Sequence, residues 1–307
     1  MNFAMRALLV LLLVAGSEPS RANDEEQPTD PAAPAPAAPT RWVVPGQVAP
    51  PDRAYGWRQL AYDARFLVRR PGALDRRDRW TLLGVAGATL LLYAWRDEIR
   101  EEVLDTRSDS RTDLLDGART MGKGAFAPAL ALGAWAASLA TRDPRERETA
   151  QMLLESAGFS AVAALGGSFV LAAERPEDGD SITLFDADGH GVSLDAALAA
   201  SVIPPLRCQY LRLRPGDGRG RRALKRTATA LLYTGAALTA LQRLDQDKHW
   251  APDAFLGLVA GLGVGRTICE SHEEAREKRR RVGLRATPGG AAVVWSFGGR
   301  RAASVSP

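Results

Sequence analysis

The chain of 307 residues alternates between apolar blocks rich in Ala, Leu, Gly and Val and connecting segments that hold most of its charge. The blocks contain few runs of β-branched residues, which favours helices over strands. We therefore predict an all-α protein, a bundle of six helices. The blocks are Trp80–Trp95, Ala125–Thr141, Ser156–Ala173, Val192–Ile203, Thr227–Leu241 and Trp250–Val264.

The first fifty residues differ from the rest. A basic residue precedes the apolar run Ala7–Ala15, and a small-x-small pattern ends at Ala22, as in an export signal. The run is short for a membrane span. We expect residues 1–22 to be a signal peptide or an N-terminal anchor. Residues 23–53, rich in Pro and Ala, are expected to form an extended linker.

The predicted helical domain covers residues 54–270. It opens with Tyr55–Val68, whose apolar residues follow helical spacing and predict an amphipathic helix on a membrane surface. A basic tail, residues 271–307, follows the domain. It holds two β-prone runs, VGLRAT and AAVVWSF, on either side of a glycine pair, and these predict either a short hairpin or a disordered end.

The blocks fit either membrane spans or a soluble bundle. Each is shorter than the roughly 20 residues of a span, and one contains Asp195. Glycines at four-residue intervals, Gly257, Gly261 and Gly265, favour close helix contact in lipid but also occur in soluble bundles. The loops alternate between basic and acidic, which predicts membrane insertion with the acidic loops outside the cytoplasm. A cleaved leader would conflict with that orientation. Either the leader stays uncleaved, or the Tyr55–Val68 helix or another block does not cross as assumed, or the bundle is wholly periplasmic.

Charge and cysteine content narrow the possible partners. Forty basic residues oppose 36 acidic ones, and no basic stretch is interleaved with aromatic residues, so no nucleic-acid partner is expected. The two cysteines, Cys208 and Cys269, lie outside any CxxC or Cys/His cluster, which argues against structural zinc. They are either a disulfide or two inert buried thiols, and we favour the thiols.

The chain has three histidines. His272 lies in the charged run SHEEAREKRRR and is expected to be solvated. His190 and His249 each open an apolar block. Asp253 follows His249 by four residues in a helix expected to start at Trp250, where a carboxylate can hold one imidazole nitrogen and leave the other as a nucleophile.

Arg243, six residues before His249, offers a planar fork to phosphate oxygens. The pattern Arg-x5-His-x3-Asp resembles the third motif of the type 2 phosphatidic acid phosphatase superfamily, which includes lipid phosphatases, bacterial acid phosphatases and vanadium haloperoxidases. The family's first motif is Lys-x6-Arg-Pro and its second is Pro-Ser-Gly-His. The ends of both motifs are found in this chain, in the same order, before Arg243. The residues that fit are Arg175, Pro176, Gly189, His190, Arg243, His249 and Asp253, and the resemblance spans roughly residues 80 to 270.

The resemblance implies a role for each matching residue. His249 would attack phosphorus and form a phosphohistidine, oriented by Asp253, while His190 protonates the leaving oxygen. Two arginines, Arg175 and Arg243, would neutralise the phosphate oxygens, and the backbone N–H near Gly189 would add a donor. This chemistry needs no metal or other cofactor. The expected substrate is a phosphorylated lipid or a small phosphate ester. The expected location is the bacterial cell envelope, either the inner membrane with a periplasmic site or the periplasm.

The first and second motifs are both altered. Ser168 stands where the family has lysine, and Ala187-Asp188 stand where it has Pro-Ser. An ionised Asp188 about 4 Å from a phosphate would repel it by several kcal/mol. Asp188 could instead cap the helix that follows it.

These departures leave several functions open. The first is an active phosphatase, and its alternative is a degenerate relative that binds a phosphorylated lipid or a partner without turnover. Haloperoxidase chemistry ranks below both, because the site has lost a cation that would hold vanadate. A purely structural helical bundle is the remaining alternative.

Overall fold

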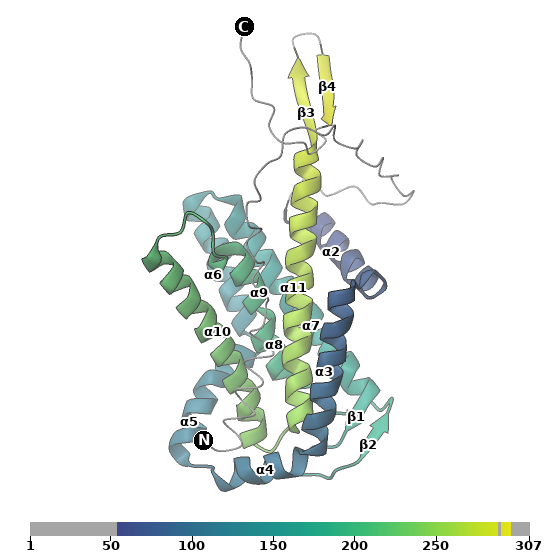
Figure 1. The fold of residues 1–307 in the computed structure, drawn as a ribbon. Coiled ribbons are helices and arrows are strands. Elements are labelled where there is room, and N and C mark those ends of the chain that lie inside the picture. Colours follow the sequence, from purple (N-terminus) through teal and green to yellow (C-terminus); the bar gives the residue numbers. More distant parts are fainter. Residues whose placement is uncertain (1–53, 288–289, 296–307) are drawn as a thin grey trace, which may run out of the picture.

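The computed structural model describes residues 54–287 and 290–295, and these residues are mostly helical (Figure 1). The predicted signal peptide and linker lie outside them. The helices are α2 Trp57–Arg69, α3 Arg76–Ala94, α4 Arg96–Asp105, α5 Asp109–Ala118, α6 Phe126–Thr141, α7 Pro144–Val170, α8 Leu194–Ser201, α9 Ile203–Leu206, α10 Arg219–Asp245 and α11 Ala251–Arg281. Shorter helical turns are η1 Arg70–Ala73, η2 Arg119–Gly122 and η3 Arg207–Leu211.

The predicted apolar blocks coincide with α3, α6, α7, α8 with α9, α10 and α11. The third block is partly wrong at its end, because the helix stops at Val170 and Leu171–Ala173 forms strand β1. This strand pairs antiparallel with β2, Ile182–Leu184. The predicted C-terminal hairpin is confirmed as β3 (Val282–Thr287) and β4 (Gly290–Trp295), which are also antiparallel.

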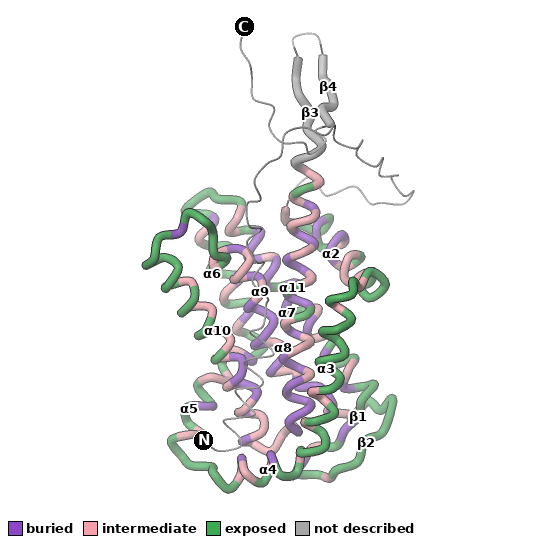
Figure 2. The backbone as a smooth tube through the Cα atoms, viewed as in Figure 1, coloured by how far each residue is buried: buried purple, intermediate pink, exposed green. Residues whose placement is uncertain are grey.

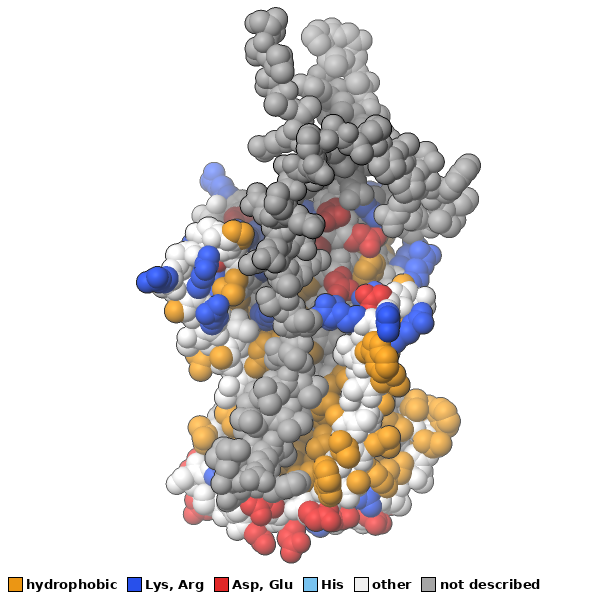
Figure 3. Space-filling view, in the orientation of Figure 1, with side chains coloured by type: hydrophobic (Ala, Val, Ile, Leu, Met, Phe, Trp, Pro, Cys, Tyr) orange, Lys and Arg blue, Asp and Glu red, His pale blue; other side chains and the backbone are white. Residues whose placement is uncertain are grey.

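The elements divide between two ends of an elongated body (Figure 1). At one end lie α4, α5 and the β1–β2 hairpin, and we call it the acidic end because exposed acidic side chains gather there (Figure 3). At the other lie α2 and the C-terminal part of α11. We call that one the basic end, because the α6–α7 and α9–α10 connections and the end of α11 are rich in arginine.

The centre of the bundle is α8, most of whose residues are buried (Figure 2). Four of its alanines are fully inaccessible to solvent, and they pack against α10 and α11 or against α7. Alanine has high helix propensity and the smallest side chain that keeps it, so neighbouring helices can approach α8 closely. These residues are Ala196, Ala197, Ala199 and Ala200.

The closest approach joins α8 to α11. At each of three glycines of α11, an added Cβ would lie well inside contact distance of a backbone carbonyl oxygen of α8 or its N-cap, at 2.4, 2.1 and 2.7 Å. The spacing of four residues keeps the three contacts on one face of each helix. The pairs are Gly257 with Ser193, Gly261 with Ala197, and Gly265 with Ser201.

Large apolar side chains cover much of the outer surface. On the face seen in Figure 3, an apolar region over α3 and the β1–β2 hairpin lies between arginines on one side and acidic residues on the other. Within residues 54–287 and 290–295, two helices are long and apolar enough to cross a membrane, Pro144–Val170 and Ala251–Arg279. A third span results if the bent pair Asp109–Gly122 and Phe126–Thr141 counts as one.

The predicted helix Tyr55–Val68 is confirmed as α2. Two of its polar residues, Gln59 and Asp63, are fully buried, whereas Trp57 and Val68 are exposed. Its arginines are exposed as well, so apolar and basic side chains share the outer face of the helix.

Two expectations about the C-terminal half are wrong. Cys208 and Cys269 form a disulfide rather than two thiols, because the π-turn of η3 places one sulfur against α11. His272 is buried rather than solvated, with 1% of its surface exposed. The reason is that α11 continues without a break through the predicted start of the basic tail, so this part of the tail packs on α2 and α7.

Candidate functional site

Three segments that are distant in sequence meet at the acidic end. They are the loop after β1, the loop before α8, and the turn between α10 and α11. The ring nitrogen Nδ1 of His249 lies 3.1 Å from the carbonyl oxygen of His190, and the two imidazole centroids are 6.5 Å apart. The charge of Arg175 acts on both imidazoles. The structure thus brings together the residues that the motifs predicted.

Two glycines allow the loop before α8 to lie directly on β1. An added Cβ at Gly189 would be 2.4 Å from the Cα of Ala172, and one at Gly191 would be 1.7 Å from the carbonyl oxygen of Leu171. Between them, the backbone N–H of His190 donates to the carbonyl of Ala173 at 2.9 Å. Only glycine fits such a close backbone contact. The contact fixes the position of His190.

Ion pairs hold the turn that carries His249. Arg100 of α4 donates to both carboxylate oxygens of Asp247 at 2.7 and 2.6 Å, and Asp247 has the left-handed φ of 55° that reverses the chain. The neighbouring Lys248 pairs with Glu177 of the loop after β1 at 2.5 Å, so it is not a free solvated lysine. A bidentate guanidinium contact restricts geometry more than a single bond does. The turn is therefore held from two sides.

The burial of His249 sets its protonation. Its side chain is 12% exposed, and burial together with the nearby Arg243 lowers its pKa to about 3. Burial, followed by the charge of Arg175, also lowers the pKa of His190. A neutral imidazole that donates from Nδ1 to a carbonyl keeps its lone pair on Nε2. His249 is thus arranged as a neutral nitrogen nucleophile.

Asp253 does not make the expected hydrogen bond to His249. Its Oδ2 is 4.0 Å from Nδ1 and accepts the backbone N–H of Trp250 at 3.1 Å. The reason lies in the start of α11, which begins at Ala251 rather than Trp250. Asp253 is then the third residue of the helix, where a carboxylate folds back on the N-cap N–H. The carbonyl of His190 takes the orienting role that we had expected of Asp253.

A third arginine stands beside the site, and no motif pointed to it. Arg119 of η2 donates from Nε to Asp195 Oδ2 at 2.9 Å, and Arg243 Nη1 approaches the same oxygen at 3.3 Å. The field of Arg175 also acts on Arg243. The only hint in the sequence was Asp195 itself, a carboxylate in an apolar block that needs a partner when buried.

The two altered motif positions have different surroundings. The hydroxyl of Ser168 is buried, where it donates to the carbonyl of Val192 at 2.9 Å and accepts its N–H at 3.1 Å. Asp188 is exposed, and its charge acts on His190. Asp188 is not a helix cap, because α8 starts later and is capped by Ser193.

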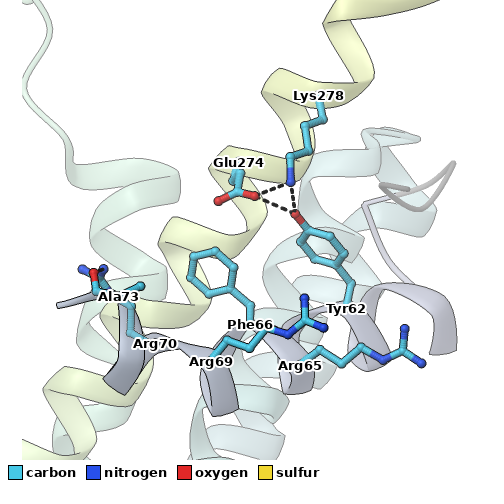
Figure 4. A pocket seen from close by; sticks show the side chains of 8 residues that line it. All are labelled: Tyr62, Arg65, Phe66, Arg69, Arg70, Ala73, Glu274 and Lys278. Carbon is cyan, nitrogen blue, oxygen red and sulfur yellow. Dashed lines mark hydrogen bonds and ion pairs between the residues drawn. The ribbon is translucent and has the colours of Figure 1, made fainter. Parts of the chain in front are cut away.

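A pocket of about 420 Å³ lies elsewhere, between α2 and α11 at the basic end (Figure 4). None of the predicted site residues lines it. Its lining residues are Tyr62, Arg65, Phe66, Arg69, Arg70, Ala73, Glu274 and Lys278.

Comparisons with models of protein families, with curated proteins and with solved structures find no match for this chain. The site offers a neutral imidazole nitrogen, a second imidazole and three guanidinium groups, two of which pair with Asp195. Such a set suits a tetrahedral oxyanion such as phosphate.

Proposed function

We propose that this chain is a phosphatase of the type 2 phosphatidic acid phosphatase kind, with a six-helix bundle embedded in the bacterial inner membrane and its site on the periplasmic face. It hydrolyses phosphomonoesters or lipid (pyro)phosphates through a phosphohistidine. The observation that carries the proposal is the orientation of His249, whose Nδ1 faces the carbonyl of His190 and leaves Nε2 for attack. The two histidines come from motifs that lie 59 residues apart.

The first step transfers the phosphoryl group to the protein. Nε2 of His249 attacks phosphorus, the N–P bond forms, and the bond to the leaving oxygen breaks. Protonated His190 gives its proton to that oxygen. The low pKa of free His190 disfavours the protonated form, but a bound phosphate dianion favours it by direct attraction.

The second step releases phosphate. His190, now neutral, accepts a proton from water as the water oxygen attacks phosphorus. The N–P bond breaks, its electron pair returns to His249, and inorganic phosphate leaves. Arg175 and Arg243 oppose the negative charge that the phosphoryl oxygens carry throughout, the usual role of guanidinium groups in phosphoryl transfer.

Arg119 supplies the cation that the first motif lacks. The expected lysine position holds Ser168, whose hydroxyl is committed to Val192 and does not join the site. Arg119 shares the Asp195 carboxylate with Arg243, so both guanidinium groups are held in one network. The site then has three cations, as the family motifs lead one to expect, although Arg119 comes from η2 and not from the first-motif segment.

Membrane embedding is supported by the surface and by charge. Two or three helices can span, and apolar side chains cover the outside of α3 between an acidic and a basic end. Basic loops face the cytoplasm in most membrane proteins, and this tendency supports a periplasmic position for the acidic end and its site.

The experiment is phosphate release by the full-length protein, assayed both in membranes and in the periplasmic fraction. The substrates are phosphatidic acid, an isoprenoid pyrophosphate and p-nitrophenyl phosphate. We expect His249→Gly to lose turnover and to recover part of it with added imidazole, which can replace the missing nucleophile. His190→Ala should still form an acid-labile phosphoenzyme from p-nitrophenyl phosphate, whose leaving group needs no proton. Wild-type protein that releases no phosphate, or release that is unchanged in His249→Gly, would refute the proposal.

The second candidate is a degenerate relative that binds phosphate without turnover, and exposed Asp188 beside His190 favours it. Asp188→Ser restores the family residue on the surface. A large gain from almost no activity would support degeneration, whereas little change would mean that the wild-type site works. Ser168→Lys is a poor companion test, because it breaks both buried hydrogen bonds to Val192.

A further inference from the structure

The basic end contains a second cluster of buried polar groups that the proposed reaction does not use. Asp63 of α2, Glu155 of α7 and His272 of α11 are at most 6% exposed, and one ligand atom of each lies within 4.8 Å of the other two. Twenty-one residues of α11 separate Ala251 from His272, so the cluster is roughly 30 Å along the helix from the His249 turn.

The atoms of His272 divide between an outer and an inner side. Its Nδ1 lies 2.9 Å from Oε1 of Glu148, and Arg276 in turn donates to both oxygens of Glu148 at 2.9 and 3.0 Å. Nε2 points the other way, to Oδ2 of Asp63 at 3.2 Å and Oε2 of Glu155 at 3.8 Å. A carboxylate on the far nitrogen of a histidine is the arrangement that orients metal-binding imidazoles in proteins.

The two carboxylates bind neighbouring polar side chains and also face His272. Oε1 of Glu155 accepts from Gln151, and Oδ1 of Asp63 accepts from Gln59 at 2.8 Å and from Ser271. Oε2 of Glu155 and Oδ2 of Asp63 face His272, and Oδ2 also accepts from Gln59 at 3.1 Å. Nε2 of His272 and Oε2 of Glu155 are buried and have no hydrogen-bond partner among the described residues. Such orphan atoms are costly unless something bonds them.

We propose that Asp63, Glu155 and His272 bind a divalent transition-metal ion of the Zn²⁺ or Mn²⁺ class. One imidazole nitrogen and two carboxylate oxygens are a donor set that suits these ions. Ligand atoms about 2.1 Å from a tetrahedral ion are roughly 3.4 Å apart, and the separations of 3.2 and 3.8 Å around Nε2 bracket that spacing.

The site would fasten α2 to the bundle. Asp63 is its only ligand from α2, while α7 and α11 supply the others. Beside it, the hydroxyl of Tyr62 donates to Glu274 at 3.0 Å and accepts from Lys278 at 3.1 Å, a second link between α2 and α11 (Figure 4). A metal bound here therefore has a structural effect that can be measured without any assay of catalysis.

The test uses full-length protein purified in detergent. We expect elemental analysis to find one metal ion per chain, and a chelator to remove it, lower the apparent Tm and speed amide hydrogen exchange in α2. Chelator-treated protein should regain the ion from Zn²⁺ or Mn²⁺ alone. Co²⁺ bound in its place should give visible absorption bands of a tetrahedral or five-coordinate site.

Variants separate a metal site from a simple ion-pair cluster. His272→Lys keeps a positive charge between the carboxylates but removes the nitrogen ligand, so it should fold and bind no metal. Glu148→Gln should weaken binding about 10- to 100-fold, since it holds the ligand without touching the ion. His249→Ala, at the other end of α11, should bind as wild type does.

Two results would overturn the proposal. One is wild-type protein that binds no stoichiometric ion and keeps its Tm when a chelator or Zn²⁺ is added. The other is binding that persists in both His272→Lys and Asp63→Asn. If His272→Lys folds fully and neither it nor the wild type changes its Tm with chelator, the cluster is a set of ion pairs without a metal.

Discussion

Replacing Gly261 by alanine tests the contact between α8 and α11. The new Cβ would be 2.1 Å from the carbonyl oxygen of Ala197, which belongs to the backbone of a buried helix and cannot rotate away. Overpacking of this kind costs about 1–3 kcal/mol, and an immovable neighbour points to the upper end. Alanine gains about 1 kcal/mol over glycine in helix propensity. The net loss of unfolding free energy is therefore about 2 kcal/mol.

Gly263 is a matched control two residues further along α11. An added Cβ there has no atom within 4 Å, so Gly263→Ala should raise the free energy of unfolding by about 1 kcal/mol through helix propensity alone. The two variants then differ by about 3 kcal/mol, which at roughly 2–4 °C per kcal/mol separates their melting temperatures by roughly 6–12 °C. Thermal unfolding in detergent, followed by circular dichroism, measures the difference. If Gly261→Ala melted at or above Gly263→Ala, the close packing of α8 on α11 would be wrong.

Three further predictions concern the site and the disulfide. The kcat/KM for an alkyl phosphate should fall as pH rises through the pKa of His190, which burial holds below 6.5, because only the protonated imidazole donates to the leaving oxygen. The pH profile for p-nitrophenyl phosphate should be flatter, since its leaving group needs no proton. Equal profiles for the two substrates would contradict the role of His190. Arg119→Ala should lower kcat/KM on the order of 10²-fold, whereas Arg226→Ala on the exposed side of α10 should not, and equal effects would remove Arg119 from the site. Cys269→Ser should lower the free energy of unfolding by about 4 kcal/mol, because the disulfide joins residues 61 positions apart. A reductant should lower the Tm of the wild type but not that of the variant.

The helical fold could be predicted because it depends on composition. Most of every apolar block lies in a helix, and the β3–β4 hairpin follows from β-prone runs around two glycines. The N-terminal half of α7 was missed because it is polar. Its Glu148 and Glu155 are buried only because His272 arrives from α11, more than 100 residues later, and no local pattern records that contact.

The candidate site was predicted in part for a similar reason. Local motifs identified His190 and His249, and the glycine contacts of the loop before α8 place them together. The partner of His249 was wrong, because Asp253 lies on the same helix turn as an unpaired N–H and caps it instead. Arg119 comes from a turn more than 70 residues before Asp195, so its part depends on the packing of η2 against α8.

The acidic end gives the approach to the site an unusual salt dependence. Exposed carboxylates lie on α4 and along residues 177–188 at the same end as the site, so an anion dissolved in water should meet a repulsive field on its way to the arginines. Dissolved salt screens that field, with a Debye length of about 8 Å at physiological ionic strength. Association of a soluble phosphate ester should therefore become faster as salt is added, the reverse of an ordinary anion site. A lipid that diffuses laterally between the helices avoids the carboxylates, and its rate should respond far less.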